Sequence, residues 1–184
     1  MSRIPTPASI EAAPAAAQPL LAAAKKQIGV APNLFRVIAN SPAALEGYLG
    51  LNAALAKGAL APATRERIAL AVAEINGCNY CLSAHTYLGR NVAKLDEAEI
   101  AANRRGTSND PTADAAVRLA VKIVNARGHV ADVDISTARL AGVSDAELIE
   151  IVLHVALNTL TNYVNEVAGT EIDFPAVPAA RRAA

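Results

Sequence analysis

The chain has 184 residues, enough for a single domain with a hydrophobic core, and its 17 basic residues balance its 17 acidic ones. A zero net charge with scattered basic residues argues against nucleic-acid binding, which needs a clustered basic face. Hydrophobic residues make up 53% of the chain and aromatic residues only 3%, with many alanines, so the composition favours helices. No apolar run reaches the roughly 20 residues of a transmembrane helix, so we expect no membrane association.

The first half of the chain begins with a proline-rich arm and continues in helices. The arm lacks the continuous apolar stretch of a secretory signal, so we expect a cytoplasmic protein. Ser41 and Pro42 predict an N-cap followed by proline in the first helical turn, and Gly58 predicts the end of that helix. The helices expected in this half run from Ala15 to Gln27, Asn33 to Ala39, Pro42 to Gly58 and Ala63 to Ile75.

The second half of the chain carries helix signals to near its end. Ser144 and Glu147 form an S-x-x-E capping box before a long apolar helix that reaches about Glu166. An Asn-Tyr pair recurs in INGCNYCLSAH and ALNTLTNYVNEV, which suggests a degenerate two-fold repeat but is equally consistent with chance. No alternating strand pattern is present, so the predicted fold class is all-α, a single-domain helical bundle. The other helices expected here are Cys78 to Leu88, Leu95 to Asn103, Pro111 to Ala126 and Ser136 to Leu140.

The segment AEINGCNYCLSAHTYLGR holds both cysteines of the chain, Cys78 and Cys81, and His85 follows four residues after the second. If a helix begins at Cys78, the three side chains fall on one face. A C-x-x-C pair at a helix N-terminus lowers a thiol pKa and gives a nucleophilic thiolate. A nearby histidine transfers protons, and the second thiol closes a disulfide on the oxidised first one. In the cytoplasm such a pair is typical of catalysis or metal binding rather than of a structural disulfide.

Two glutamates on the preceding helix are candidates to complete this site. Glu66 lies on an apolar face that continues through Ala69 and Ala73, which favours a buried carboxylate acting as a proton relay. It is almost equally consistent with a solvated residue in the first helical turn. Glu74 is the alternative, four residues before Cys78.

Other interpretations of these residues are less specific. Cys78, Cys81 and His85 supply three ligands, whereas a structural zinc site usually needs four, so we expect no metal. No dinucleotide-binding or P-loop motif is present, and no cofactor is expected. His154 begins a polar stripe with Asn158 and Asn162 that could line a site, although buried hydrogen bonds or a subunit contact are the more common roles. His129 follows a glycine and is expected in a solvated loop.

The glutamate, cysteines and histidine fit the E-x11-C-x-x-C-x3-H pattern of alkylhydroperoxidase D. The chain resembles the carboxymuconolactone decarboxylase superfamily, and within it the peroxidase-related branch. The supporting stretches are GVAPNLFRVIANSP, RERIALAVAEINGCNYCLSAHTYLG and ALNTLTNYVNEVAGTEIDFP. The resemblance implies an alkylhydroperoxidase D-like helical domain over residues 29–175, after an arm and first helix over 1–28 and before a tail over 176–184.

The resemblance also implies a role for each residue of the motif. Cys81 is the peroxide-attacking cysteine, Cys78 the resolving cysteine, His85 the proton shuttle and Glu66 its acidic partner. A helix-dipole argument alone favours Cys78 as the more acidic thiol. The chain departs from the family at Tyr80, where alkylhydroperoxidase D has a histidine, and tyrosine does not titrate near neutral pH.

The function implied is reduction of hydroperoxides through a dithiol/disulfide cycle, with a thiol or protein electron donor and a homo-oligomeric assembly of two, three or six subunits. We expect the helix from Ser144 to Glu166 or the N-terminal arm to contribute subunit contacts, because the alanine-rich helices leave apolar faces to cover. One alternative is a disulfide-exchange or redox-sensing module without peroxidase activity. Another alternative is a carboxymuconolactone-type decarboxylase, but decarboxylation of that kind needs no thiol pair.

Overall fold

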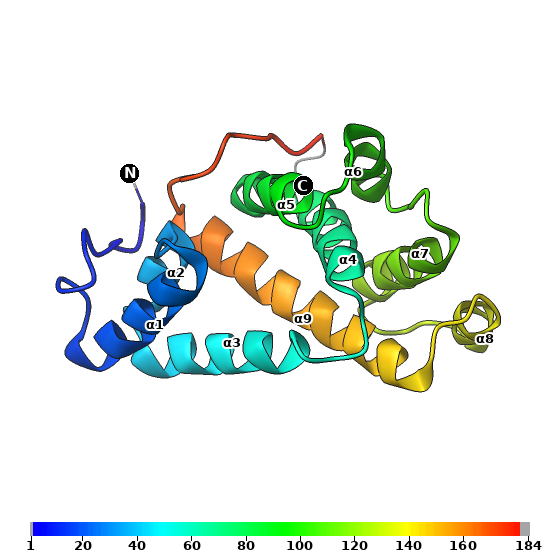
Figure 1. Ribbon diagram of the computed structural model, residues 1–184, viewed down its shortest axis with the longest axis horizontal. Coiled ribbons are helices and arrows are strands. Elements are labelled where there is room, and N and C mark those ends of the chain that lie inside the picture. Colours follow the sequence, from blue (N-terminus) through cyan, green and yellow to red (C-terminus); the bar gives the residue numbers. More distant parts are fainter. Residues whose placement is uncertain (1, 181–184) are drawn as a thin grey trace.

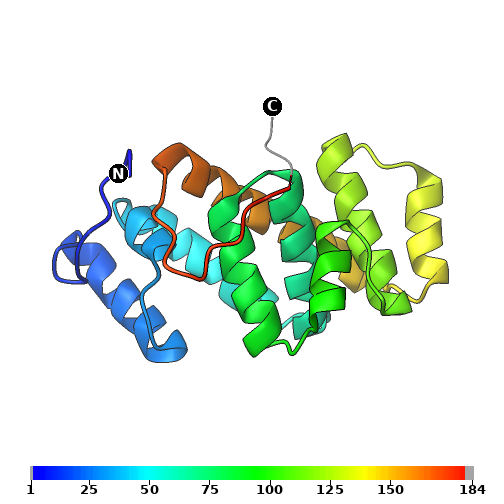
Figure 2. The ribbon, with the colours of Figure 1, turned by 90° about the horizontal axis from the view of Figure 1, so that it is seen from above.

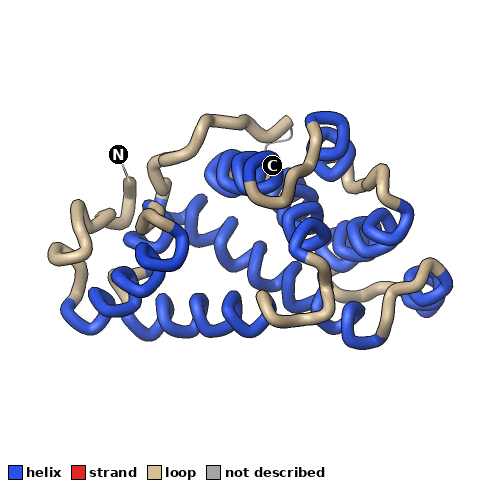
Figure 3. Tube along the Cα trace, in the orientation of Figure 1, coloured by secondary structure: helices blue, strands red, loops and turns tan. Residues whose placement is uncertain are grey.

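The computed structural model describes residues 2–180, and every regular element in that range is helical (Figures 1 and 3). No strand occurs in this range, so the all-α prediction is confirmed. After a short 3-10 helix, η1 (Ala15–Ala17), the α-helices are α1 (Gln18–Ile28), α2 (Asn33–Ile38), α3 (Pro42–Leu55), α4 (Pro62–Ile75), α5 (Asn79–Asn91), α6 (Glu97–Arg104), α7 (Pro111–Ala126), α8 (Asp132–Leu140) and α9 (Asp145–Ala168).

Local capping signals set several of the helix ends. Ser41 accepts a hydrogen bond from the Ala44 amide, and Pro42 is the first residue of α3. The capping box of Ser144 and Glu147 forms as predicted at the start of α9. Gly169 ends α9 in the left-handed region at φ 61°, a conformation that glycine adopts without steric cost.

Several expected boundaries differ from the structure, and three of them concern α3, α8 and α5. The third helix ends at Leu55, three residues before Gly58, because residues 56–58 form a turn with short-range backbone hydrogen bonds. Helix α8 begins at Asp132 rather than Ser136, since the Asp134 carboxylate accepts a hydrogen bond from the Ala131 amide and caps the earlier start. Helix α5 continues through Gly89 to Asn91.

The two Asn-Tyr pairs occupy different positions in their helices. Asn79 and Tyr80 open α5, and Tyr80 is buried. Asn162 and Tyr163 lie inside α9, and Tyr163 is 60% exposed. The suggested two-fold repeat therefore receives no support from the environments of these two pairs.

Helix α4 is the central element, and it packs against α5, α6, α7 and α9. Its residues contribute to two hydrophobic clusters, because Leu70 and Ala73 face one side while Ile68 and Val72 face the other. The first cluster includes α1–α3 and α5, and the second includes α7–α9. A helix apolar on all sides is typical of a buried position. Helix α9 runs diagonally across the molecule between these groups (Figure 1).

The segment after α9 crosses back over α5, as seen from above in Figure 2. The Val177 amide donates to Ser83 Oγ at 2.9 Å, and the Ala179 amide donates to Asn79 Oδ1 at 2.8 Å. The ring of Phe174 packs edge-on against Tyr80, with 5.9 Å between ring centroids. This C-terminal strap, residues 170–180, therefore covers the N-terminal half of α5. Within residues 2–180 no helix is long and apolar enough to cross a membrane.

Candidate active site

The turn between α4 and α5 places the two cysteines. Gly77 adopts φ 67° and reverses the chain after α4. Cys78 is then the N-cap of α5, and its Sγ accepts a hydrogen bond from the Cys81 amide at 3.4 Å. Cys81 lies in the first turn of the helix. The cysteine spacing therefore makes Cys78 part of the helix cap and places both sulfurs at the same end of α5.

Both cysteines are free thiols and almost completely buried, with exposed fractions of 0% for Cys78 and 1% for Cys81. Asn165 of α9 donates its side-chain amide to Cys81 Sγ at 3.2 Å. An amide donor on a buried sulfur stabilises the thiolate over the thiol. The site therefore includes a residue from the far end of the sequence.

The two thiols have opposite shifts in pKa. The pKa of Cys81 is lowered to about 6, and the largest cause is a hydrogen bond from the Cys78 thiol. Burial acts in the opposite direction, whereas the His85 charge and the amides of Asn162 and Asn165 lower the pKa further. The same hydrogen bond, together with burial, raises the pKa of Cys78. The helix-dipole argument that favoured Cys78 as the more acidic thiol is overridden, because Cys78 is the donor of the pair.

His85 and Glu66 form a hydrogen-bonded pair between α5 and α4. The distance from His85 Nδ1 to Glu66 Oε2 is 2.9 Å, and both side chains are about one-fifth exposed, at 21% and 22%. Burial acts to lower the pKa of His85, but the Glu66 charge and hydrogen bond and the nearby Cys81 together raise it. The pair therefore favours an imidazolium next to a thiolate.

Glu74, the alternative carboxylate, points elsewhere. Its carboxylate pairs with Arg104 Nε at 2.7 Å and accepts a hydrogen bond from the Ala180 amide at 2.6 Å. These contacts fix the C-terminal strap against α4 and α6. Of the two glutamates, only Glu66 lies against His85.

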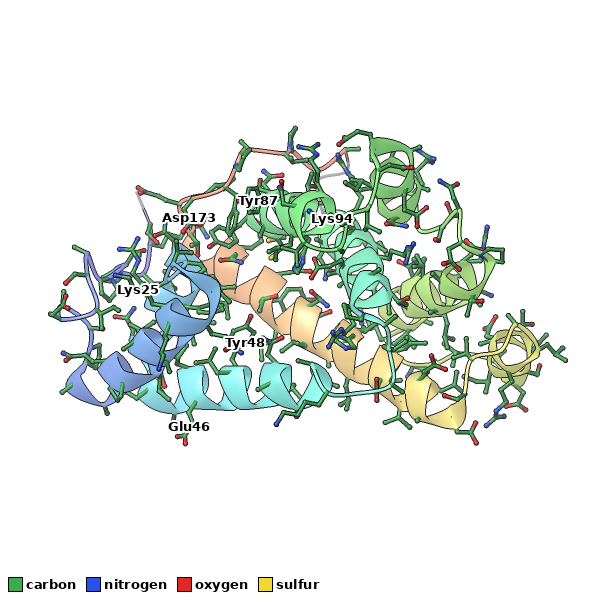
Figure 4. All side chains as sticks on the ribbon, viewed as in Figure 1. Lys25, Glu46, Tyr48, Tyr87, Lys94 and Asp173 are labelled. Carbon is green, nitrogen blue, oxygen red and sulfur yellow. The ribbon has the colours of Figure 1, made fainter. Side chains whose placement is uncertain are left out.

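A cavity of about 470 Å³ opens beside Cys81 and His85, between α3, α4, α5 and α9. Tyr48 projects from α3 into the space below α5 (Figure 4). Most of the remaining lining is apolar, and Ile28 and Val92 are exposed at 52% and 69%. Two other hollows lie away from both cysteines, one beside Arg104 and one beside Arg67.

Tyr80, which occupies the position of the family histidine, has a packing role. Its hydroxyl accepts a hydrogen bond from the Leu34 amide at 3.1 Å and holds α2 against α5. Burial raises the pKa of Tyr80 above its usual value. This side chain therefore cannot exchange protons at neutral pH as a histidine would.

Three residues of the site were not anticipated from the sequence. Asn165 continues the polar stripe of α9 by one more helical step, so extending the periodicity would have found it. Tyr48 and Arg65 line the cavity, but no local pattern distinguishes them. His154 also lines the cavity, which was one of the two expected roles of the stripe, and its Nε2 has no hydrogen-bond partner in residues 2–180. Asn158 and Asn162 form the hydrogen bonds expected of the other role, and the subunit contact stays a prediction. His129 is exposed, as expected.

Among the described residues, no group of three or more histidine, cysteine or acidic side chains is arranged to hold a metal ion.

The sequence from residue 42 to residue 122 matches the model of the carboxymuconolactone decarboxylase family. This match covers less than half of the chain and agrees with the resemblance to the carboxymuconolactone decarboxylase superfamily. No curated protein matches its sequence. The matched region spans α3 to most of α7 and therefore contains Glu66, both cysteines and His85.

Several solved structures share the fold of this chain at low sequence identity. A peroxidase-related protein with an alkylhydroperoxidase AhpD core from Ralstonia eutropha JMP134 has a TM-score of 0.83 and 24% identity, covering 94% of this chain and 92% of that one. A peroxidase-related protein from Silicibacter sp. TM1040 has a TM-score of 0.78 and 22% identity, with 91% and 88% covered. The debrominase Bmp8 in complex with 2,3,4-tribromopyrrole has a TM-score of 0.69 and 18% identity, with 84% of each chain covered. Because the sequence identities are below 25%, these structures establish the fold of the chain and not its activity.

Proposed function

We propose that this protein is a thiol-dependent peroxidase that reduces organic hydroperoxides through a Cys78–Cys81 dithiol/disulfide cycle. The observation that carries the proposal is the arrangement around Cys81: a buried sulfur of low pKa, a donor thiol beside it, and the Glu66–His85 pair at the same cavity wall. A thiolate is the nucleophilic form of cysteine, and a pKa of about 6 makes it the main form at neutral pH.

The reaction begins with attack of the Cys81 thiolate on the terminal oxygen of the hydroperoxide. The O–O bond breaks, Cys81 becomes a sulfenic acid, and the departing alkoxide takes a proton from His85 to leave as an alcohol. Glu66 stabilises the imidazolium before this transfer through its 2.9 Å contact with Nδ1. The Cys78 sulfur then attacks the sulfenic sulfur, and the proton of its thiol passes to the departing hydroxyl, which leaves as water with the disulfide formed. A dithiol donor then reduces the disulfide and returns both thiols.

Alkylhydroperoxidase D has a histidine where this chain has Tyr80. Without that histidine, His85 is the residue that transfers the proton, and neutral hydrogen-bond donors stabilise the thiolate. The Asn165 amide, 3.2 Å from Cys81 Sγ, is such a donor. It lowers the energy of the thiolate without carrying a proton to the substrate. We therefore assign Asn165 as a positioning residue and His85 as the general acid.

Burial of both sulfurs disfavours the alternative of a protein disulfide-exchange module. Such exchange requires a partner thiolate to approach a sulfur in line, and neither cysteine exceeds 1% exposure. The cavity gives a small molecule a route to Cys81 instead. The decarboxylase alternative is disfavoured because that reaction does not use a pair of thiols. The debromination activity of Bmp8 is not carried over, since its likeness extends to the fold alone.

The proposal is tested by following consumption of cumene hydroperoxide with dithiothreitol as electron donor. Cys81→Ser should abolish peroxide reduction and prevent the Cys78–Cys81 disulfide. Pre-reduced Cys78→Ser, assayed without dithiothreitol, should consume about one equivalent and stop at the sulfenic acid. His129→Ala, an exposed histidine, serves as the matched control and should retain wild-type turnover. Full activity in Cys81→Ser would contradict the assignment and point to Cys78. No peroxide consumption by the wild-type protein would refute the function.

A further inference from the structure

The imidazole of His154 faces the cavity that holds Cys81, and its Nε2 has no hydrogen-bond partner although His154 is only 5% exposed. An unsatisfied buried polar atom costs roughly 1–3 kcal/mol, and such atoms often await a ligand that supplies the missing partner. Burial, and then the neighbouring Arg65 charge, lowers the pKa of His154, so the ring is neutral at neutral pH. A neutral imidazole can donate one hydrogen bond from Nε2 to an acceptor in the cavity.

Arg65 of α4 lines the same cavity. One of its nitrogens donates to the Leu55 carbonyl at 3.0 Å, and within residues 2–180 it forms no ion pair. The nearby carboxylates are engaged elsewhere: Glu66 with His85, and Glu150 with the backbone amides of Ala59 and Leu60 at 2.8 and 2.9 Å. Arg65 therefore places a positive charge in the cavity wall. Within residues 2–180 its remaining N–H donors have no partner, so they can bind an anion.

His154 lies apart from the α9 residue that contacts the Cys81 sulfur. His154 precedes Asn165, the residue in contact with Cys81 Sγ, by eleven positions on the same helix. At a rise of 1.5 Å per residue this corresponds to about 16 Å along α9. The lining between them includes Leu157, Ala69 and Ala84. Asn158 and Thr161 of α9 also line this stretch, so apolar and polar side chains alternate along it.

We propose that Arg65 and His154 form a subsite for the carboxylate of an amphipathic organic hydroperoxide, whose apolar body fills the cavity and whose peroxide group reaches Cys81. This inference rests on the proposed peroxidase function for the identity of the reacting group. The guanidinium fork matches the two oxygens of a carboxylate, and Nε2–H of His154 supplies a further donor. A neutral hydroperoxide of the same length would leave both groups unpaired.

Binding of an unreactive pair, octanoate and octanamide, tests the subsite without any turnover. Calorimetry on the reduced full-length protein should give at least tenfold tighter binding for octanoate, which should also slow alkylation of Cys81 by iodoacetamide. Arg65→Gln and His154→Leu should each lower the octanoate-to-octanamide affinity ratio tenfold or more. Arg65→Lys keeps the charge and should retain part of the preference. Arg118→Gln, an exposed arginine on α7, is the control and should keep the wild-type ratio.

The outcomes separate this inference from the proposed function. Equal affinity for the two ligands overturns it, as does an unchanged ratio in Arg65→Gln, the result expected if Arg65 only fixes the end of α3 through Leu55. Octanoate preference without hydroperoxide turnover would uphold the carboxylate subsite and refute the peroxidase. Turnover of cumene hydroperoxide without octanoate preference would leave the peroxidase and refute the subsite.

Discussion

Removing the hydrogen bond between Glu66 and His85 should slow peroxide reduction without altering the fold. His85→Ala removes the proton donor for the departing alkoxide, and general acid catalysis typically contributes about 10²- to 10⁴-fold. Glu66→Gln keeps the shape of the side chain but removes the charge 2.9 Å from Nδ1. A hydrogen bond to a charged group is worth about 1.5–3 kcal/mol, so this variant should lose roughly 10- to 150-fold.

If the two residues act as one unit, the double variant should be only slightly slower than His85→Ala, because effects within a unit are not additive. The assay is single-turnover reduction of cumene hydroperoxide by the pre-reduced protein. Circular dichroism and light scattering should show unchanged folding and assembly in all three variants. Fully multiplicative losses would mean independent roles. Normal turnover in Glu66→Gln would mean that Glu66 has no part in proton transfer.

Two further predictions concern α9. Asn165→Leu removes one amide donor from the Cys81 sulfur and should raise its pKa by about one unit, measured from the pH dependence of iodoacetamide alkylation; an unchanged pKa would exclude Asn165 from thiolate stabilisation. The exposed apolar stripe of α9, from Ile149 to Val167, should lie in a homo-oligomer interface. Leu160→Lys should then lower the mass found by light scattering, and a monomeric wild-type protein at micromolar concentration would contradict this.

The helices could be predicted because their signals are local. Ser41, Pro42 and the Ser144 capping box act within one turn of the helices that they begin, so tertiary structure changes little there. Two of the boundaries that were missed by three or four residues depend on details that residue type alone does not fix. Gly58 marks the end of a turn rather than of a helix, and Asp134 caps an earlier start of α8.

The candidate site could be predicted only as far as short-range geometry reaches. Cys78, Cys81 and His85 lie on one element, so spacing alone brings them together. Glu66 joins them because the turn at Gly77 folds α4 back against α5. Asn165 follows Cys81 by 84 residues, and its approach depends on how α9 packs across the molecule. No periodicity within α5 could indicate that contact.

The lowered pKa of Cys81 links protein stability to pH. A thiol with a folded-state pKa of about 6, against an ordinary value of 9.0, stabilises the fold fully above pH 9, and this contribution is lost as the pH falls through 6. His85 acts in the opposite sense, because its raised pKa gives stability that is present below its unfolded value and lost as the pH rises. Comparison with Cys81→Ser isolates the thiolate. The difference in unfolding free energy between wild type and variant should grow from pH 6 to pH 9, by at most about 4 kcal/mol.

Urea unfolding at several pH values, with a phosphine reductant to keep both cysteines reduced, measures this difference. A Cys78→Ser comparison controls for loss of the other sulfur; because the pKa of Cys78 is raised, its own thiol stays protonated across the window. A hydroxyl at position 78 can still donate to the Cys81 sulfur, so the variant should keep most of the rise with pH. A wild-type advantage over Cys81→Ser that stays constant from pH 6 to pH 9 would mean that Cys81 is an ordinary thiol in the folded protein. The nucleophile would then have to be generated by His85 only when substrate is bound, and the rate of peroxide reduction would follow the titration of His85 rather than that of Cys81.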